Sequence, residues 1–319
     1  MKILWLVIPC YNEEEVLRET ARRTSETVRE LAAKGKISSE SKIAFVNDGS
    51  TDRTLEIITD LCRQDDIFAC VNLSRNRGHQ NALLAGLMTA KKYADAVISL
   101  DADLQDDIGA IEKFVDEFLT GKDVVYGVRS DRKTDSFFKK TSAELFYKFM
   151  RLMGVDIVYN HADYRLMSRR ALEGLSEFDE VNTFLRGLVP QIGYPSATVE
   201  YSRGRRYAGK SKYPLKKMLS FAFEGITSFS VRPIKMAFAL GFFAFLVSIF
   251  MLCYCIVQRV SGNAVSGWAS LGVSIWAIGG LQMLMLGVVG EYIGKIYLEV
   301  KHRPKYIIES LTLNGVRIE

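Results

Sequence analysis

Residues 96–105 read Ala-Val-Ile-Ser-Leu-Asp-Ala-Asp-Leu-Gln, a short apolar run that ends abruptly in carboxylates. The run predicts a buried strand followed by a polar loop at the strand end. In extended backbone, Asp101 and Asp103 point the same way, roughly 6–7 Å apart along the chain. Two carboxylates so placed can face one hard cation such as Mg²⁺ or Mn²⁺, with Gln105 as a further oxygen ligand. A plain polar loop is the alternative interpretation, because this spacing is common.

The first 130 residues alternate strand-like and helix-like patterns. Strands are expected at the apolar runs 3–8, 42–46, 68–73, 96–100 and 123–126. Helices are expected between them, at 14–33, 51–63, 79–92 and 108–119. This alternation predicts an α/β fold with a mostly parallel, doubly wound sheet. Ligands of such sheets bind at the carboxyl ends of the strands, where polar loops fall at 9–13, 47–52, 74–78 and 101–105.

The pattern weakens after residue 127. Residues 137–153 look helical, 163–168 are mixed, and 196–201 are expected to add a strand. Among the polar loops, Asp48 could accept hydrogen bonds from a base or a ribose. The alternative role, a turn residue or helix cap, fits Asp52 better.

Two long segments near the C-terminus carry no charged residue and no histidine. They are residues 236–257 and 266–290, and each is long enough to cross about 30 Å of hydrocarbon as a helix. A soluble core is the weaker alternative, because soluble helices of this length usually have a charged face. Basic residues flank both segments, which predicts a hairpin with both ends in the cytoplasm. We therefore expect a multi-pass protein of the inner (plasma) membrane.

Residues 214–231 show apolar side chains at helical spacing beside lysines, which predicts an amphipathic helix lying in the membrane interface. An ordinary helix packed on the preceding domain is the alternative. The expected organisation is thus a cytoplasmic α/β domain over 1–213, this interfacial helix, and a transmembrane hairpin with a cytoplasmic tail over 232–319.

Composition excludes several classes of protein. The net charge of +5 fits attraction to an anionic leaflet, and no dense basic tract interleaved with aromatics indicates nucleic-acid binding. The five cysteines show no zinc-site spacing. The apolar stretch at 3–8 is too short for a signal peptide and runs into Pro9.

Seven segments, in order, carry a resemblance to a known family. Four of them resemble family 2 glycosyltransferases: 7–13 (Val-Ile-Pro-Cys-Tyr-Asn-Glu), 46–52 (Val-Asn-Asp-Gly-Ser-Thr-Asp), 73–79 (Leu-Ser-Arg-Asn-Arg-Gly-His) and 100–106 (Leu-Asp-Ala-Asp-Leu-Gln-Asp). Three more resemble the polyprenyl-phosphate branch, which includes bactoprenol glucosyltransferases and dolichol-phosphate mannose synthases: 162–167, 206–213 and 290–297. The departures are Asn47, where many relatives have Asp, and Asp107, where Pro is usual.

The resemblance implies a GT-A fold, a divalent metal (Mg²⁺ or Mn²⁺) and residue roles. It implies donor nucleotide-sugar binding by Pro9, Tyr11, Glu13, Asp48, Asp101, Ala102 and Arg129. It implies metal binding by Asp101, Asp103 and Gln105. It implies acceptor and diphosphate binding by Arg206, Lys210 and Lys212. Asp163 matches the acid proposed as catalytic base, and Asp103 is the second residue expected to be catalytic. For Asp163 the alternative is a structural ion pair with Arg165 or another neighbour.

We therefore expect inverting transfer of one hexose from a nucleotide diphosphate sugar, UDP-glucose or UDP-N-acetylglucosamine, to undecaprenyl phosphate. The product would be a polyprenyl monophosphosugar for modification of cell-envelope glycans. The alternatives are transfer from GDP-mannose and a non-catalytic, membrane-anchored protein that binds sugar nucleotides. A processive polysaccharide synthase is disfavoured, because the sequence holds no Q-x-x-R-W string. The expected partners also include membrane lipid and further copies of the chain, with a homotetramer favoured.

Overall fold

The computed structural model describes residues 1–129, 161–180, 184–202, 230–261 and 267–318. These residues divide into two compact units. Residues up to 202, together with 303–318, belong to the first unit, and residues 230–302 belong to the second.

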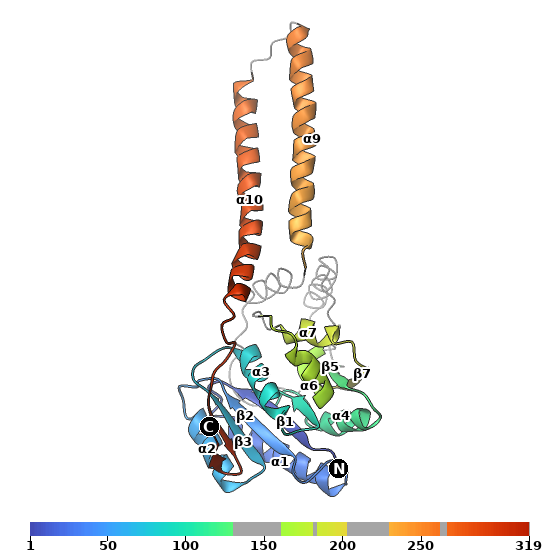
Figure 1. Cartoon of the computed structure of the whole chain (residues 1–319), viewed down its shortest axis with the longest axis vertical. Helices are drawn as coiled ribbons and strands as arrows, with labels where there is room; N and C mark the ends of the chain where they lie inside the picture. The colour runs from blue at the N-terminus through green and yellow to red at the C-terminus, as the bar shows by residue number, and fades with distance from the viewer. Residues whose placement is uncertain (130–160, 181–183, 203–229, 262–266, 319) are drawn as a thin grey trace. The chain divides into compact units, whose positions relative to one another are not determined.

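The first unit is built on one mixed sheet (Figure 1). Within the described residues its strands are β1 (Leu4–Cys10), β2 (Lys42–Asn47), β3 (Phe68–Leu73), β4 (Ala96–Ser99), β5 (Val124–Arg129), β6 (His161–Ser168), β7 (Ser196–Tyr201), β8 (Ile308–Leu313) and β9 (Val316–Arg317). Their order is β7-β5-β6-β4-β1-β2-β3-β8-β9. Strands β4, β1, β2 and β3 are parallel, whereas β6 and β8 run against their neighbours. The predicted α/β fold with a mostly parallel sheet is confirmed.

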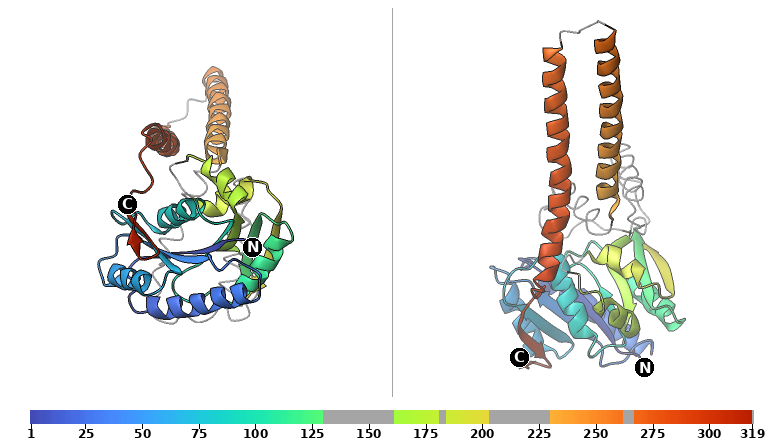
Figure 2. Two further views of the ribbon diagram at one scale, coloured as in Figure 1. Left: turned by 60° about the horizontal axis from the view of Figure 1, so that its bottom comes forward. Right: turned by 45° about the horizontal axis from the view of Figure 1, so that its top comes forward.

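Helices cover both faces of this sheet. They are α1 (Leu17–Ala33), α2 (Thr54–Gln64), α3 (His79–Ala90), α4 (Ala110–Leu119), α6 (Arg169–Ser176) and α7 (Leu185–Gln191). Helices α1, α2 and α4 pack on one face, and α3 lies on the other (Figure 2, left). The four helices expected before residue 120 are present, with α1 beginning three residues later than the sequence predicts.

The side chains of β1 alternate between the two faces of the sheet, which explains how the core on each face is filled. Leu6 and Ile8 are fully buried and join the core formed with α1, α2 and α4. Val7 points to the opposite face, as the two-residue period of a strand requires. There α3 approaches so closely that a Cβ on Gly86 would lie 2.4 Å from Val7 Cγ1. Burial of each of these large aliphatic side chains stabilises the fold by about 1.5–3 kcal/mol.

The C-terminal tail forms part of this sheet, which the sequence analysis did not predict. Strand β8 pairs antiparallel with β3, and β9 closes a short hairpin onto β8. Leu311 and Leu313 are buried in the pairing, and Ser74 N donates to Ile307 O at 3.0 Å. Within the segment 232–319, expected to hold a hairpin and a tail, the tail residues 303–318 thus belong to the sheet unit, where they cover the otherwise open edge of β3.

The second unit contains two long apolar helices, α9 (Arg232–Val260) and α10 (Trp268–Val300). They lie side by side in Figures 1 and 2 and contact each other. Both are long and apolar enough to cross a membrane, judged by length and composition. Large apolar side chains such as Phe238 are exposed, and Tyr292 Oη donates to Ser230 O at 2.5 Å. The predicted interfacial helix at 214–231 lies almost wholly outside the described residues.

Replacement of Leu311 by alanine tests whether the tail stabilises the sheet. We expect the free energy of unfolding of the sheet unit to fall by about 2 kcal/mol or more, because a buried side chain leaves a cavity. The melting temperature of the full chain in detergent measures this. Ile318→Ala is the matched control, because Ile318 is 54% exposed in the same tail. Equal melting temperatures for the two variants would contradict the assignment.

Candidate functional site

The site lies where the carboxyl ends of β1, β2 and β4 meet. Strand β6 runs antiparallel to β4 and therefore begins beside these carboxyl ends. Ser99 pairs with Arg165, and the same register places Asp163 level with Asp101, just beyond the end of β4. His79 Nε2 lies 3.6 Å from Asp101 Oδ1 and 3.9 Å from Asp163 Oδ2. An antiparallel strand thus adds a third carboxylate to the loop that carries Asp101 and Asp103.

Asp163 is buried among two guanidinium groups and an amide. Its Oδ1 accepts hydrogen bonds from Arg165 Nη2 and from Arg186 Nε, the latter at 3.3 Å. Its Oδ2 accepts from Arg186 Nη2 at 3.0 Å and from Gln80 Nε2 at 3.2 Å. Ser99 Oγ donates to the backbone oxygen of Asp163, which fixes the main chain as well. The carboxylate is therefore held in place on both oxygens.

These partners determine the charge of Asp163. Burial raises the pKa of its carboxyl, but the attraction of Arg186, Arg165 and His79 outweighs burial and holds that pKa well below the usual range. Asp163 therefore stays ionised and is a weak proton acceptor. The geometry matches the ion pair with Arg165 that the sequence left as the alternative to a catalytic base.

The loop after β4 is held by a bond from α1 and by a bond within the loop. Thr20 Oγ1 of α1 donates to Ala102 O at 2.8 Å, and Gln105 N donates to Asp103 Oδ1 at 3.1 Å. Leu104 has a φ of 58°, in the left-handed region that non-glycine residues rarely adopt. The side chain of Asp101 is 39% exposed, whereas Asp103 is nearly buried. One carboxylate of the pair is thus open to a ligand.

A divalent cation fits the donor chemistry of this loop. Desolvation by the surrounding protein raises the pKa of Asp101, although part of its side chain is exposed; the carboxylates of Asp163 and Asp103 add to the rise, and His79 opposes it. Among the described residues, no three acidic, histidine or cysteine side chains form a closed metal cage. Mg²⁺ usually binds through one or two carboxylates plus substrate phosphates and waters. Asp101 and Asp103 suit a cation that shares its coordination with a diphosphate.

Asp48 joins the second polar loop to the third. Its side chain is buried and accepts from Arg77 N at 2.6 Å and from Gly78 N at 2.9 Å. Burial raises the pKa of Asp48 against the effect of these two amides. The loops also touch at Gly49, whose φ is +62° and whose Cβ, if present, would lie 2.5 Å from Asn76 N. Asp48 therefore holds together the loops at 47–52 and 74–78, whatever else it binds.

The first polar loop is bonded to the second in the same way. Asn12 N donates to Ser50 Oγ at 3.1 Å, and Thr51 N donates to Asn12 Oδ1 at 2.9 Å. Glu13 N donates to Thr54 Oγ1 at 2.9 Å. Pro9 is buried at the end of β1, whereas Tyr11 is 41% exposed. The exposed phenol ring is available to a flat partner such as a base.

Arg129 stands at the end of β5 and is tied to the loop after β4 through Tyr201. Arg129 Nε donates to Tyr201 Oη at 3.3 Å, and Tyr201 Oη donates to Asp106 Oδ1 at 2.7 Å. Burial raises the pKa of Asp106 to about 6. Arg206, Lys210 and Lys212 lie outside the described residues.

Sequence reasoning missed three members of the Asp163 cluster, namely His79, Gln80 and Arg186. The sequence analysis assigned His79 no part in the site, although it directly follows the polar loop 74–78. Arg186 lies in α7, and its only sequence signal is a charge inside the apolar run Phe-Leu-Arg-Gly-Leu-Val at 184–189.

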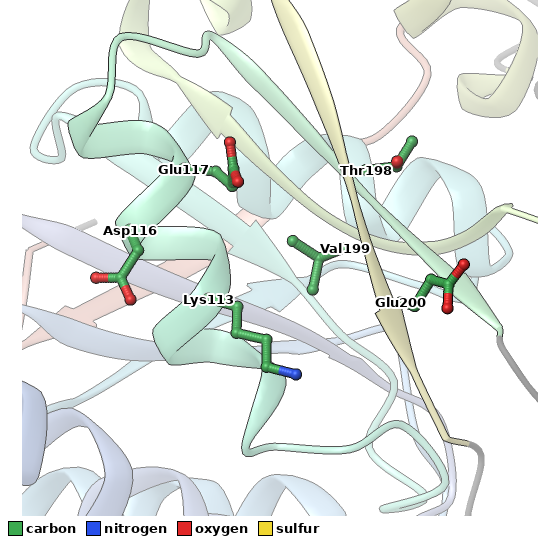
Figure 3. A pocket seen from close by; sticks show the side chains of 6 residues that line it. All are labelled: Lys113, Asp116, Glu117, Thr198, Val199 and Glu200. Carbon is green, nitrogen blue, oxygen red and sulfur yellow. The ribbon is translucent and has the colours of Figure 1, made fainter.

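A hollow of about 430 Å³ lies elsewhere, between α4 and β7 (Figure 3). It is lined by Lys113, Asp116, Glu117, Thr198, Val199 and Glu200, none of which the sequence analysis selected. A second hollow of about 460 Å³ includes Gln105 and Asp106 and thus reaches the loop after β4.

Comparison with known proteins identifies the family. The model for "Glycosyl transferase family 2" matches residues 5–176, more than half of the chain. The uncharacterized glycosyltransferase YkoT of Bacillus subtilis (strain 168) is 52% identical over 307 residues, which cover 96% of this chain and 91% of that protein. The bactoprenol glucosyl transferase of Shigella phage SfV is 41% identical, over 96% of this chain and 97% of its own length.

Two further proteins are similar. The prophage bactoprenol glucosyl transferase homolog of Escherichia coli (strain K12) is 40% identical over 96% of this chain and 98% of its own. Glucosyl-3-phosphoglycerate synthase from Mycobacterium tuberculosis has a TM-score of 0.46 and 19% identity, over 72% of this chain and 79% of its own. The family match and the full-length relatives agree with the polar loops described above. The chain is therefore a glycosyltransferase that belongs to glycosyl transferase family 2.

Proposed function

We propose that the protein transfers one glucose, with inversion, from UDP-glucose to undecaprenyl phosphate. The relatives named bactoprenol glucosyl transferases support this choice, because they are 40–42% identical over nearly the whole chain. The product would be a polyprenyl monophosphoglucose for modification of cell-envelope glycans.

The environment of Asp163 carries the proposal for the acceptor. Arg165, Arg186 and Gln80 donate to both of its oxygens, so this carboxylate is poorly placed to take a proton. A sugar hydroxyl would need a strong base before it could attack. A phosphate monoester needs none, because its second pKa is about 6 and it is already anionic near pH 7. The site therefore favours a lipid phosphate over the hydroxyl acceptor of a polysaccharide synthase.

In this reaction an oxygen of the lipid phosphate attacks the anomeric carbon in line, and the bond from that carbon to the diphosphate breaks. Asp163 orients Arg186 toward the developing charge. The donor would lie against the loops that hold Pro9, Tyr11, Glu13, Asp48 and Ala102. Arg129 and the basic segment with Arg206, Lys210 and Lys212 would contact the phosphates. Mg²⁺ or Mn²⁺ held by Asp101 and Asp103, with Gln105 nearby, would neutralise charge on the leaving nucleoside diphosphate.

The chain path supports a multi-pass membrane protein. Strand β8 follows α10 in sequence and yet pairs with β3 of the sheet. The polypeptide must therefore cross any membrane an even number of times between β7 and β8. One crossing by α9 and one by α10 satisfies this condition. With the basic flanks, this supports a cytoplasmic sheet unit at the inner membrane. A homotetramer stays a prediction, which the mass of the complex in detergent can test.

Asp103→Asn tests the catalytic assignment against the non-catalytic alternative. We expect transfer to fall about a hundredfold or more, the scale of losing one group that stabilises transition-state charge. The assay follows labelled glucose from UDP-glucose into the organic phase with undecaprenyl phosphate as acceptor. Asp60→Asn on α2 is the matched control and should keep full activity. Transfer by Asp103→Asn at the wild-type rate would remove the role assigned to Asp103.

A donor panel and a chelator test the substrate and the cation together. Purified protein is incubated with UDP-glucose, UDP-N-acetylglucosamine or GDP-mannose, and mass spectrometry identifies the lipid product. We expect product from UDP-glucose, loss of turnover in a chelator, and recovery when Mg²⁺ or Mn²⁺ is restored. Product from GDP-mannose alone would favour the mannose-transferring alternative. Full turnover in the chelator would exclude the cation.

The pH dependence of transfer distinguishes the acceptor from Asp163 as the titrating group. We expect kcat/KM to fall below about pH 6, because the acceptor phosphate then gains its second proton. Arg186→Leu removes a strong cause of the lowered Asp163 pKa, so that pKa should rise while the acidic limb stays in place. The profiles of both proteins are measured under kcat/KM conditions. An acidic limb that moves with the substitution would make Asp163 the base.

A further inference from the structure

The tail strand carries one extra residue opposite β3. Asn72 pairs with Ser310 and Leu73 pairs with Ile308, so Glu309 is the additional residue of a bulge. Bulges re-aim side chains and often lie next to active sites. Here the carboxylate of Glu309 accepts from Asn72 Nδ2 at 2.9 Å. The bulge thus directs a charge from the C-terminal strand toward the carboxyl end of β3.

This bond begins a chain of hydrogen bonds that leads into the donor-side loops. Asn72 Oδ1 accepts from Asn47 Nδ2 at 2.7 Å, and Asn47 Oδ1 accepts from Ser50 N at 3.2 Å. Asn47 and Asn72 are buried, with exposed fractions of 1% and 6%. Ser50 Oγ in turn accepts from Asn12 N. The chain therefore connects Glu309 to both loops that flank the proposed nucleotide position.

The two ends of this chain agree on the direction of its bonds, because Ser50 N can only donate and an ionised Glu309 can only accept. An ionised carboxylate only accepts, so Asn72 must turn its NH₂ group toward Glu309. Its oxygen then faces Asn47, which must donate in turn and present its own oxygen to Ser50 N. Glu309 supplies the acceptor that this arrangement requires for the NH₂ group of the buried Asn72. Without Glu309, Asn72 and Asn47, which directly precedes Asp48, would be held in this orientation from the Ser50 end alone.

We propose that Glu309 is a positioning residue of the donor site, so that the strand following the apolar hairpin completes the nucleotide-binding loops. The expected change in the donor KM rests on the proposed function, whereas the expected change in the ordering of residues 47–52 does not. Glu309 is exposed and contributes little to the packing of the tail, which Leu311 and Leu313 already provide. Its contribution is the acceptor that completes the bonding of Asn72 and thereby supports the position of Asn47.

Substitutions at both ends of the first bond test the proposal. Glu309→Leu should raise the donor KM about three- to tenfold, the range of one net hydrogen bond, with a smaller change in kcat. It should also speed hydrogen exchange in the peptide 47–52. Glu309→Gln can still accept from Asn72 and should remain near wild type. Glu40→Leu, an exposed glutamate ahead of β2, is the matched control.

The decisive experiment exchanges the donor and the acceptor of the bond between Asn72 and Glu309. Asn72→Asp places two carboxylates together and should disturb the loop more than Glu309→Leu. The double variant Asn72→Asp/Glu309→Gln should restore it, because the new glutamine donates to the new aspartate, which still accepts from Asn47. A residue that only anchors the tail would give no such rescue.

Three results would overturn the proposal: wild-type exchange at 47–52 in Glu309→Leu, exchange raised throughout β3 and β8 rather than at the loop, or no rescue in the double variant. A failure of the proposed function gives a different experimental result. A wild-type protein without glucose transfer would remove the reaction but leave the exchange measurements able to decide the role of Glu309.

Discussion

The buried ion cluster of Asp163 with Arg165 and Arg186 is the constraint around which the site is arranged. Arg165 is 1% exposed, and a guanidinium so deeply buried is tolerated only with a partner that offsets its desolvation. Asp163 is that partner, and its second oxygen holds Arg186, which is about one third exposed. Asp163 thus offsets the desolvation of the buried Arg165 and at the same time fixes the position of the more exposed Arg186.

The loops around this cluster are held by one another rather than by the sheet alone. Asp48 bonds the amides of Arg77 and Gly78, and Asn12 bonds the loop at 50–51. Thr20 and Tyr201 brace the segment after β4 from two sides. Such cross-bracing places the side chains before a substrate arrives, which reduces the ordering that binding must otherwise drive.

Much of the sheet could be predicted from the sequence, because β1 to β4 are continuous apolar runs that end in polar loops. The polar residues that follow these runs were selected as site candidates for the same reason. The sequence pattern of β6 is mixed, because Asp-Tyr-Arg at 163–165 interrupts the apolar run with an ion pair that only the fold can bury. Arg186 contacts Asp163, and Glu309 contacts Asn72, only through the tertiary fold. The apolar run around Arg186 is the one local sign of either contact.

The position of β8 imposes an order on biosynthesis. The ribosome makes this strand after both apolar helices, so the edge of β3 has no partner until the hairpin has left the exit tunnel. Strand β8 can therefore join the sheet only after α9 and α10 have been synthesised. The sheet of the first unit is in this way completed by residues that follow the two long apolar helices.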